Sequence, residues 1–286
     1  MYMHHQVNAA SLPDAYHQAL LLLYSFGEKR PCPAYNTQEK SISITIDIAR
    51  PLAEPRISKF IPCGPAELQQ YVMEMKDGIL DFEANVTGKW AYTYHDRMMN
   101  QLIEAVKILK RDRDSRRAVV MIRNRNDILT DDPPCLTMIQ YFINDNALDC
   151  FVTFRSNDAV KAFFMNAFAL IEIQKVLANI LNCKVGHYVH TANSFHAYER
   201  DWDDLNRFCL NYIQMQKAPD RDIRKKDLVY FYDKNGIDDW YTLMQDEIPE
   251  IMDKVEYQMD KADITDPGRF VGNLRSVILR ELGELK

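Results

Sequence analysis

The sequence lacks the cysteine spacings of metal-binding and disulfide-stapled proteins. None of its six cysteines forms a CxxC pair, and they are scattered over positions 32, 63, 135, 150, 183 and 209 of a 286-residue chain. This scatter fits neither a zinc site nor the disulfide framework of a small secreted domain. We therefore expect reduced thiols, no bound metal and a cytoplasmic location.

The sequence also lacks a basic excess, a targeting segment and a membrane span. Its formal net charge is −6, which argues against a DNA polymer as partner but leaves a single nucleotide open. The most apolar early stretch, "ALLLLYSF", has no basic region, no cleavage site and too few residues to cross a bilayer. A content of 47% hydrophobic residues is present instead, which is enough for a sizeable core.

Hydrophobic patterns predict both strands and helices. "SISITIDIA" (41–49) alternates at period two, as half-buried strands do, and "AVVMIRN" (118–124) is a second predicted strand. Amphipathic patterns predict helices over 11–27, 65–76 and 95–114. The stretch 159–181 is apolar on nearly all faces, so we expect it to form a helix buried at the centre of the domain.

A hairpin is predicted between Pro133 and Asp158. "CLTMIQYFI" and "LDCFVTFR" read as strands, and "NDN" (144–146) supplies residues that tolerate left-handed backbone angles. The two outer ends of the hairpin would carry Cys135 and Arg155, which pairing of the strands would bring together.

Cys135 alone is more typical of a buried core residue than of a nucleophile. A thiolate needs positive charge nearby to form at neutral pH, and Arg155 and the "DSRR" stretch (114–117) could supply it. Successive side chains on a strand face opposite sides, so one of Arg116 and Arg117 could serve its own subunit and the other a neighbour. With Arg155 and Ser156 they could bind a phosphate, or they could form surface ion pairs with nearby aspartates.

Asn166 lies within the apolar helix, where an unsatisfied amide costs about 1–3 kcal/mol. Its partner could be another core group or a ligand amide such as the edge of a uracil. "SFHAYERD" (194–201) places His196 and Tyr198 on one face if the chain is extended, which suits hydrogen bonds to a sugar hydroxyl.

Together these motifs resemble the thymidylate synthase superfamily of folate-dependent pyrimidine-nucleotide C5 transferases. The resemblance spans Tyr92 to Asp201 and rests on a cysteine after proline with Gln140 five residues later, and on "FRSND", "SFHAY" and "DSRR". "YTYHDR" and "PPCL" are similar to archaeal-type synthases and phage nucleotide hydroxymethylases. The resemblance implies that Cys135 adds to C6 of the pyrimidine, after which C5 attacks the methylene group of 5,10-methylenetetrahydrofolate.

The resemblance also implies roles for the other motif residues. Tyr92 would assist removal of the C5 proton, Asp158 would contact the pterin or its waters, and Asn166 would recognise the base. A pyrimidine deoxynucleoside monophosphate would be held through its phosphate, sugar and base by Arg116, Arg117, Gln140, Arg155, Ser156, Asn157, Asn166, His196 and Tyr198. Family members are homodimers in which one arginine pair crosses the interface.

The sequence departs from the family pattern at several positions. Tyr71, seven residues before Gly78, replaces the general-base glutamate, and Glu67 and Glu74 lie about one turn to either side. We favour Glu74 as the base. Lys161 and its neighbours ("KAFFM") replace the family's Leu-Gly-x-Pro-Phe. The end "LRELGELK" lacks the apolar residues that close over folate in common synthases.

The expected fold is α/β (α+β), with a large mixed sheet, a buried central helix and a homodimer contact on the back of the sheet. Residues 1–216 would form the catalytic domain and 217–286 a charged, mainly helical extension packed on it. The preferred reaction is methylation of deoxyuridylate to thymidylate, since the resemblance implies uracil where Asn166 stands and phage deoxycytidylate hydroxymethylases have an aspartate. The alternatives are a deoxyuridylate or deoxycytidylate hydroxymethylase and an inactive member that binds nucleotide or RNA.

Overall fold

The computed structural model describes residues 3–217, 228–230, 240–264 and 272–285. The chain forms two compact units. Unit 1 consists of Met1–Pro62, Phe151–Ala167 and His187–Trp240. Unit 2 consists of Cys63–Cys150, Phe168–Gly186 and Tyr241–Lys286.

An eight-stranded mixed sheet has the strand order β1-β3-β9-β7-β6-β5, with β2 beside β3 and β8 beside β9. The pairs β1–β3 and β8–β9 are parallel, whereas β2–β3, β3–β9 and β5–β6 are antiparallel. This confirms the expected mixed sheet. The strands are β1 (His4–Ala9), β2 (Glu28–Cys32), β3 (Thr37–Ile48), β5 (Val119–Met121), β6 (Leu136–Asn144), β7 (Ala147–Phe154), β8 (Asn157–Asp158) and β9 (Lys184–Tyr198); a separate pair is β4 (Ile57–Ser58) with β10 (Val229–Tyr230).

Unit 1 is built on β1, β3 and β9, with α1 (Leu12–Phe26) and α6 (Trp202–Gln216). Helix α1 begins at Ser11, whose side chain accepts from the Asp14 N–H, and ends at Gly27, as the sequence predicts. Four isoleucines at 42, 44, 46 and 48 of β3 are buried, which confirms the period-two strand. The buried His17 ring of α1 lies 5.3 Å from the ring of Phe208 in α6.

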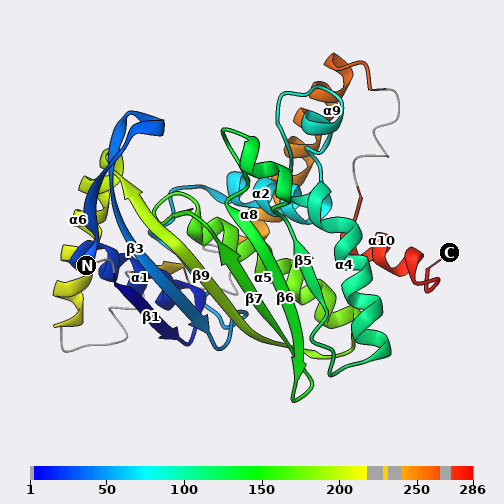
Figure 1. Ribbon diagram of the computed structural model, residues 1–286, viewed down its shortest axis with the longest axis horizontal. Coiled ribbons are helices and arrows are strands. Elements are labelled where there is room, and N and C mark those ends of the chain that lie inside the picture. The colour runs from blue at the N-terminus through cyan, green and yellow to red at the C-terminus, as the bar shows by residue number, and fades with distance from the viewer. Residues whose placement is uncertain (1–2, 218–227, 231–239, 265–271, 286) are drawn as a thin grey trace. The chain divides into compact units, whose positions relative to one another are not determined.

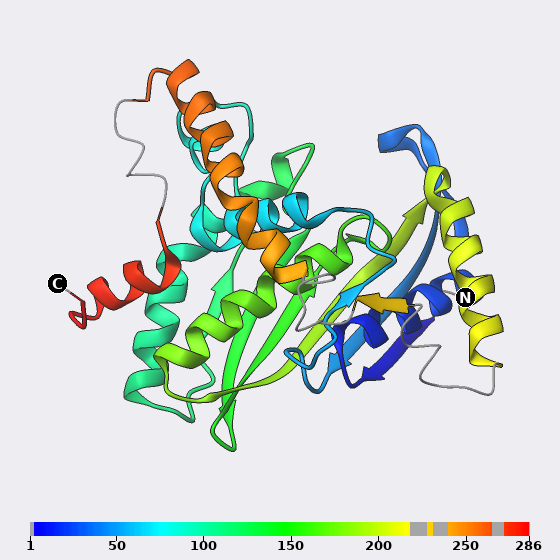
Figure 2. The ribbon, with the colours of Figure 1, turned by 180° about the vertical axis from the view of Figure 1, so that it is seen from behind.

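Unit 2 contains α2 (Pro65–Asp77), α3 (Phe82–Asn85), α4 (Tyr94–Arg111), α9 (Ile248–Lys261), α10 (Leu274–Glu281) and most of α8 (Trp240–Asp246). Helix α4 runs beside β5 (Figure 1). The Gln101 side chain bonds both backbone groups of Met121, each at 2.8 Å. Helix α9 lies along α2 (Figure 2), and a shared core is formed by Met73, Ile79, Leu80, Phe82, Ile251, Val255 and Met259.

The predicted hairpin is present as β6 and β7. Its turn residues Asp145 and Asn146 have φ of 46° and 60°, which confirms the left-handed turn. Helix α5 (Phe163–Ile180) follows, and it is long and apolar enough to cross a membrane. Because 67% of that stretch is buried, it has the burial of a core helix. The boundary at 216/217 between the catalytic domain and its charged C-terminal extension stays a prediction.

Candidate active site

Cys135 directly precedes β6 and is half-buried. The N–H of Leu136, the next residue, donates to the Tyr94 hydroxyl at 3.4 Å. Burial raises the pKa of the Tyr71 and Tyr92 phenols, and the nearby Cys135 raises the pKa of both further. Three tyrosines, Tyr71, Tyr92 and Tyr94, therefore lie near the predicted nucleophile.

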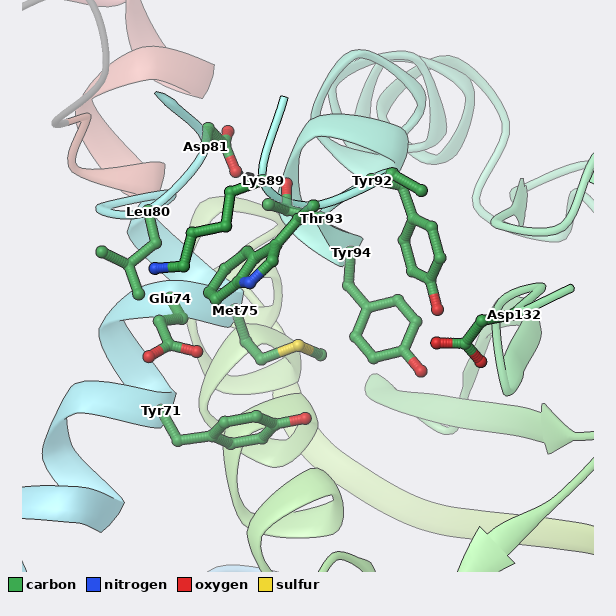
Figure 3. A pocket seen from close by; sticks show the side chains of 12 residues that line it. Tyr71, Glu74, Met75, Leu80, Asp81, Lys89, Tyr92, Thr93, Tyr94 and Asp132 are labelled. Atoms are coloured by element: carbon green, nitrogen blue, oxygen red, sulfur yellow. Dashed lines mark hydrogen bonds between the residues drawn. The ribbon is translucent and has the colours of Figure 1, made fainter. Parts of the chain in front are cut away.

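A pocket of about 380 Å³ in unit 2 is formed by α2, by the segment before α4 and by the start of α4 (Figure 3). Tyr71 and Glu74 project from α2, and the hydroxyls of Tyr92 and Tyr94 point toward the side occupied by Asp132. Its twelve lining residues are Tyr71, Glu74, Met75, Leu80, Asp81, Lys89, Trp90, Ala91, Tyr92, Thr93, Tyr94 and Asp132. Four aromatic rings and a few charged groups make it suited to a planar, polar-edged ligand.

The two candidate general bases occupy different environments. Glu74 lines the pocket, where burial raises the pKa of its carboxyl, while a 2.8 Å hydrogen bond from Gln70 Nε2 opposes the shift. Glu67 is exposed, and its Oε2 accepts the Gly64 N–H at 2.9 Å. Glu67 therefore caps α2, and of the two only Glu74 lies at the pocket.

Tyr71 and Tyr92 are both held as neutral phenols. Burial raises the pKa of Tyr71 most, and Tyr94, Glu74 and Cys135 raise it further. Burial likewise raises the pKa of Tyr92, although Arg97 opposes this. The Arg97 guanidinium lies 4.5 Å from the centre of the Tyr92 ring. Neutral phenols can donate hydrogen bonds to developing negative charge.

Arg116 and Arg117 precede β5 instead of lying in it, and both are exposed. Because β5 begins only at Val119, the alternation of strand faces does not apply to this pair, and their division between two subunits stays a prediction. Arg117 lies 3.9 Å from Asp112 in a loose ion pair. Gln140, on β6, donates from Nε2 to the Arg116 carbonyl at 2.9 Å and so ties the arginine segment to the sheet.

Unit 1 brings together a second set of predicted residues. His196 and Tyr198 lie on β9, which confirms the extended conformation, and their rings are 4.8 Å apart. The Nδ1 of His196 is 3.3 Å from the Ser194 carbonyl and 3.4 Å from the Ser156 hydroxyl. A carbonyl only accepts, so Nδ1 carries the proton; Nε2 is buried and has no partner among the residues that the structure describes.

The remaining predicted residues surround β8. The Asp158 carboxylate accepts the N–H groups of Val160 and Lys161 at 3.0 and 2.9 Å, and burial raises the pKa of its carboxyl. Asn157 is 3% exposed and Asn166 is 4% exposed. Arg155 is half-buried, and its carbonyl accepts the Ser194 N–H at 3.2 Å.

Sequence reasoning missed several residues that shape these sites. Tyr94 could have been noticed from the "YTY" spacing, which places two phenols close together at a helix start. Asp81, Thr93 and His95 gave no signal, because they meet across a loop without periodicity. Asp201 is buried and lies 3.4 Å from the Lys161 ammonium, which the sequence alone could not indicate.

Comparisons with known proteins agree on one family. A sequence model described as "Thymidylate synthase" matches residues 70–242. A protein of Methanocaldococcus jannaschii named "Putative thymidylate synthase" is 27% identical over 220 residues, which cover 72% of this chain and 98% of that one. A protein of the same name from Methanothermobacter thermautotrophicus is 32% identical over 116 residues, or 38% of this chain and 52% of that one. The fold resembles thermostable thymidylate synthase A from Bacillus subtilis, with a TM-score of 0.57 and 16% identity over 70% of this chain and 84% of that one.

Proposed function

Because this chain belongs to the thymidylate synthase family, we propose that it methylates deoxyuridylate to thymidylate with 5,10-methylenetetrahydrofolate. The observation that carries the proposal is the position of Cys135, a half-buried thiol next to Tyr94 and electrostatically coupled to Tyr71 and Tyr92. Six cysteines, none of them in a disulfide, are in keeping with a reducing, cytoplasmic location.

In the proposed reaction the Cys135 sulfur forms a bond to C6 of the base, and the C5–C6 electron pair moves toward O4. Neutral phenols donate to this developing enolate, because the raised pKa values of Tyr71 and Tyr92 keep their protons on oxygen. C5 would then bond to the methylene carbon, whose bond to the donor nitrogen would break, and the C5 proton would leave to the base. Hydride from the donor would add to that carbon, C5=C6 would re-form, and the S–C6 bond would break to release the Cys135 thiolate. Glu74 accepts that proton with help from Tyr92, since a carboxylate with a raised pKa is a better base near neutrality.

The nucleotide-binding roles follow the family motifs. The buried Nε2 of His196 supports a bond accepted from a sugar hydroxyl, with Tyr198 beside it. Phosphate binding is assigned to Arg155, Ser156, Arg116 and Arg117, base recognition to Asn166, and further nucleotide contacts to Asn157 and Gln140. The exposure of Arg116 and Arg117 supports a homodimer in which they reach a second copy.

The one-carbon donor would supply the methylene carbon and, for methylation, a hydride. The aromatic pocket beside Glu74 fits a planar pterin. The family motif assigns Asp158 to a contact with the pterin or its waters.

A hydroxymethylase remains the second candidate, favoured by Lys161. Its side chain is charged, 44% exposed and paired with Asp201 where the family places apolar residues. A charged group there favours access of water, and water in place of hydride gives a hydroxymethyl product.

The test is incubation with deoxyuridylate and methylenetetrahydrofolate, followed by mass analysis of both products. Thymidylate with dihydrofolate supports the proposal. Hydroxymethyl-deoxyuridylate with unoxidised tetrahydrofolate replaces it with the second candidate. Nucleotide binding by calorimetry without any product indicates an inactive binding member.

A further inference from the structure

Asp81 sits where the two walls of the pocket in unit 2 meet. It follows the left-handed Gly78 turn after α2, and its N–H donates to the Gly78 carbonyl at 3.0 Å. The side chain is almost fully buried, with an exposed fraction of 8%, and it lines the pocket. A buried carboxylate needs hydrogen-bond partners to offset its lost hydration.

Both oxygens of Asp81 contact the first residues of the opposite wall. Oδ1 accepts the Thr93 hydroxyl in a very short hydrogen bond, and Oδ2 lies 2.6 Å from His95 Nδ1. The Thr93 oxygen in turn accepts the Asp96 N–H at 3.1 Å, which makes Thr93 the N-cap of α4. Asp81 thus fixes Thr93, which lies between Tyr92 and Tyr94, and His95, which follows Tyr94.

The same contacts continue to the nucleophile. Tyr94 lies between Thr93 and His95, and its hydroxyl accepts from the N–H of Leu136, directly after Cys135. A continuous series of hydrogen bonds and peptide links therefore joins Asp81, Thr93, Tyr94 and the peptide that follows Cys135.

We propose that Asp81, acting through Thr93 and His95, is a positioning residue that holds Tyr92 and Tyr94 against Cys135. Asp81 itself does not touch the reacting atoms. Misplacement of catalytic groups by about 1 Å can slow chemistry a hundredfold. Loss of the Asp81 contacts with Thr93 and His95, called the Asp81 clamp below, should therefore lower turnover. The inference rests on the proposed role of Cys135 as nucleophile.

The test compares Asp81→Asn with Asp77→Asn in the full-length chain. Asp77 is a matched control because it is a half-buried carboxylate four residues earlier that accepts the Leu274 N–H at 3.1 Å, away from the tyrosines. Each variant is treated with iodoacetamide, and alkylation of Cys135 is followed by peptide mass mapping with Cys63 as internal reference. kcat and KM for deoxyuridylate are measured in parallel.

We expect Asp81→Asn to raise the alkylation rate of Cys135 about tenfold relative to Cys63, because Tyr92 and Tyr94 are no longer held against the thiol. kcat should fall about ten- to a hundredfold with little change in KM. Thr93→Val, which lacks the hydroxyl, should show the same changes as Asp81→Asn, and Thr93→Ser, which keeps it, should behave like the wild type. This pair keeps the test decisive if Asp81→Asn does not fold. Alkylation and kcat equal to those of Asp77→Asn would overturn the clamp. Wild-type protein without activity, but with the alkylation difference intact, would overturn the proposed function alone.

Discussion

Arg97 and Asp127 form a two-armed ion pair, with nitrogen–oxygen distances of 2.6 and 2.9 Å, beneath the ring of Tyr92. The Asp127 carboxylate is almost fully buried, and its hydrogen bond with Arg97 lowers its pKa. The guanidinium therefore has a fixed position from which to support Tyr92. A second anchor, besides Asp81, thus holds the tyrosine side of the pocket.

Asp127→Asn should reduce both stability and turnover. Removing one partner of a buried pair leaves the other charge uncompensated, at a cost of about 3 kcal/mol in the free energy of unfolding. Urea denaturation measures the loss. Because the pKa of Asp127 is depressed in the folded state, wild-type stability from this pair is present above pH 3.8 and is lost as pH falls further. Equal acid sensitivity of wild type and variant would contradict this assignment.

Cys135→Ser should abolish release of tritium from C5-labelled deoxyuridylate, because a serine hydroxyl is a far weaker nucleophile than a thiolate. Cys150→Ser is the control, since Cys150 is fully buried and burial raises the pKa of its thiol. Cys150→Ser should retain tritium release. Unchanged release in Cys135→Ser would remove Cys135 from the mechanism.

Glu74→Gln should lower kcat about a hundredfold or more, as expected for loss of a general base. Because burial raises the pKa of Glu74, the acid limb of the wild-type pH–rate profile should lie above pH 4.5 and disappear in the variant. Glu67→Gln is the matched control: it changes the cap of α2 and should leave kcat near the wild-type value. A greater effect at Glu67 would reverse the choice of base.

Two buried histidines should make the protein acid-sensitive. Burial lowers the pKa of His17 and of His190 to about 3, against 6.5 for a free side chain. Above pH 6.5 both states are neutral; below it the unfolded chain binds protons that the folded chain excludes, so stability falls as pH drops toward 3. Each histidine contributes a loss of about 2 kcal/mol between pH 7 and pH 5.

His190→Phe should therefore shrink the difference in unfolding free energy between pH 7 and pH 5. Its neighbours Phe154 and Phe163 already pack on that ring, with centroids 4.7 and 4.8 Å away. Tyr188→Phe removes the 3.1 Å contact with His190 Nδ1 but keeps the imidazole, so its pH difference should match that of wild type. If the two variants show the same difference in unfolding free energy between pH 7 and pH 5, the buried His190 imidazole does not cause the acid sensitivity.

Gly78→Ala should destabilise unit 2 and loosen the Asp81 clamp. Gly78 has φ of 69°, and an added Cβ would lie 2.2 Å from His95 Nδ1. Gly88→Ala separates backbone strain from steric overlap, because Gly88 has a similar φ of 66° and no atom of the described residues lies within 4 Å of the added carbon. Both variants lose about 1 kcal/mol from backbone strain, and only Gly78→Ala should also raise Cys135 alkylation. Equal Cys135 alkylation in Gly78→Ala and Gly88→Ala would show that His95 can move without affecting the tyrosines.

The sequence predicted the local elements well because their signals are local. Ser11 and Gly27 bound α1, and the Asn-Asp-Asn turn placed the hairpin. Glu74 was favoured over Glu67 from the sequence, although both lie about one turn from Tyr71 and spacing alone does not separate them. The structure distinguishes their environments, because Glu67 accepts the Gly64 N–H ahead of α2. Arg116 and Arg117 were assigned to a strand whose start is set by pairing of Val119 with Gln140, a contact across twenty residues. The Asp81 contacts likewise join residues that no periodic pattern links.

One face of helix α2 lines the pocket and another packs on α9. Glu74 and Tyr71 look into the pocket, while the neighbouring Met73 packs with Ile251 and Val255 of α9. Because α9 packs on the helix that carries the proposed base, substitutions at 251–259 should affect the position of Glu74 as well as the core. A library randomised at 251–259 would therefore select for turnover as well as for folding.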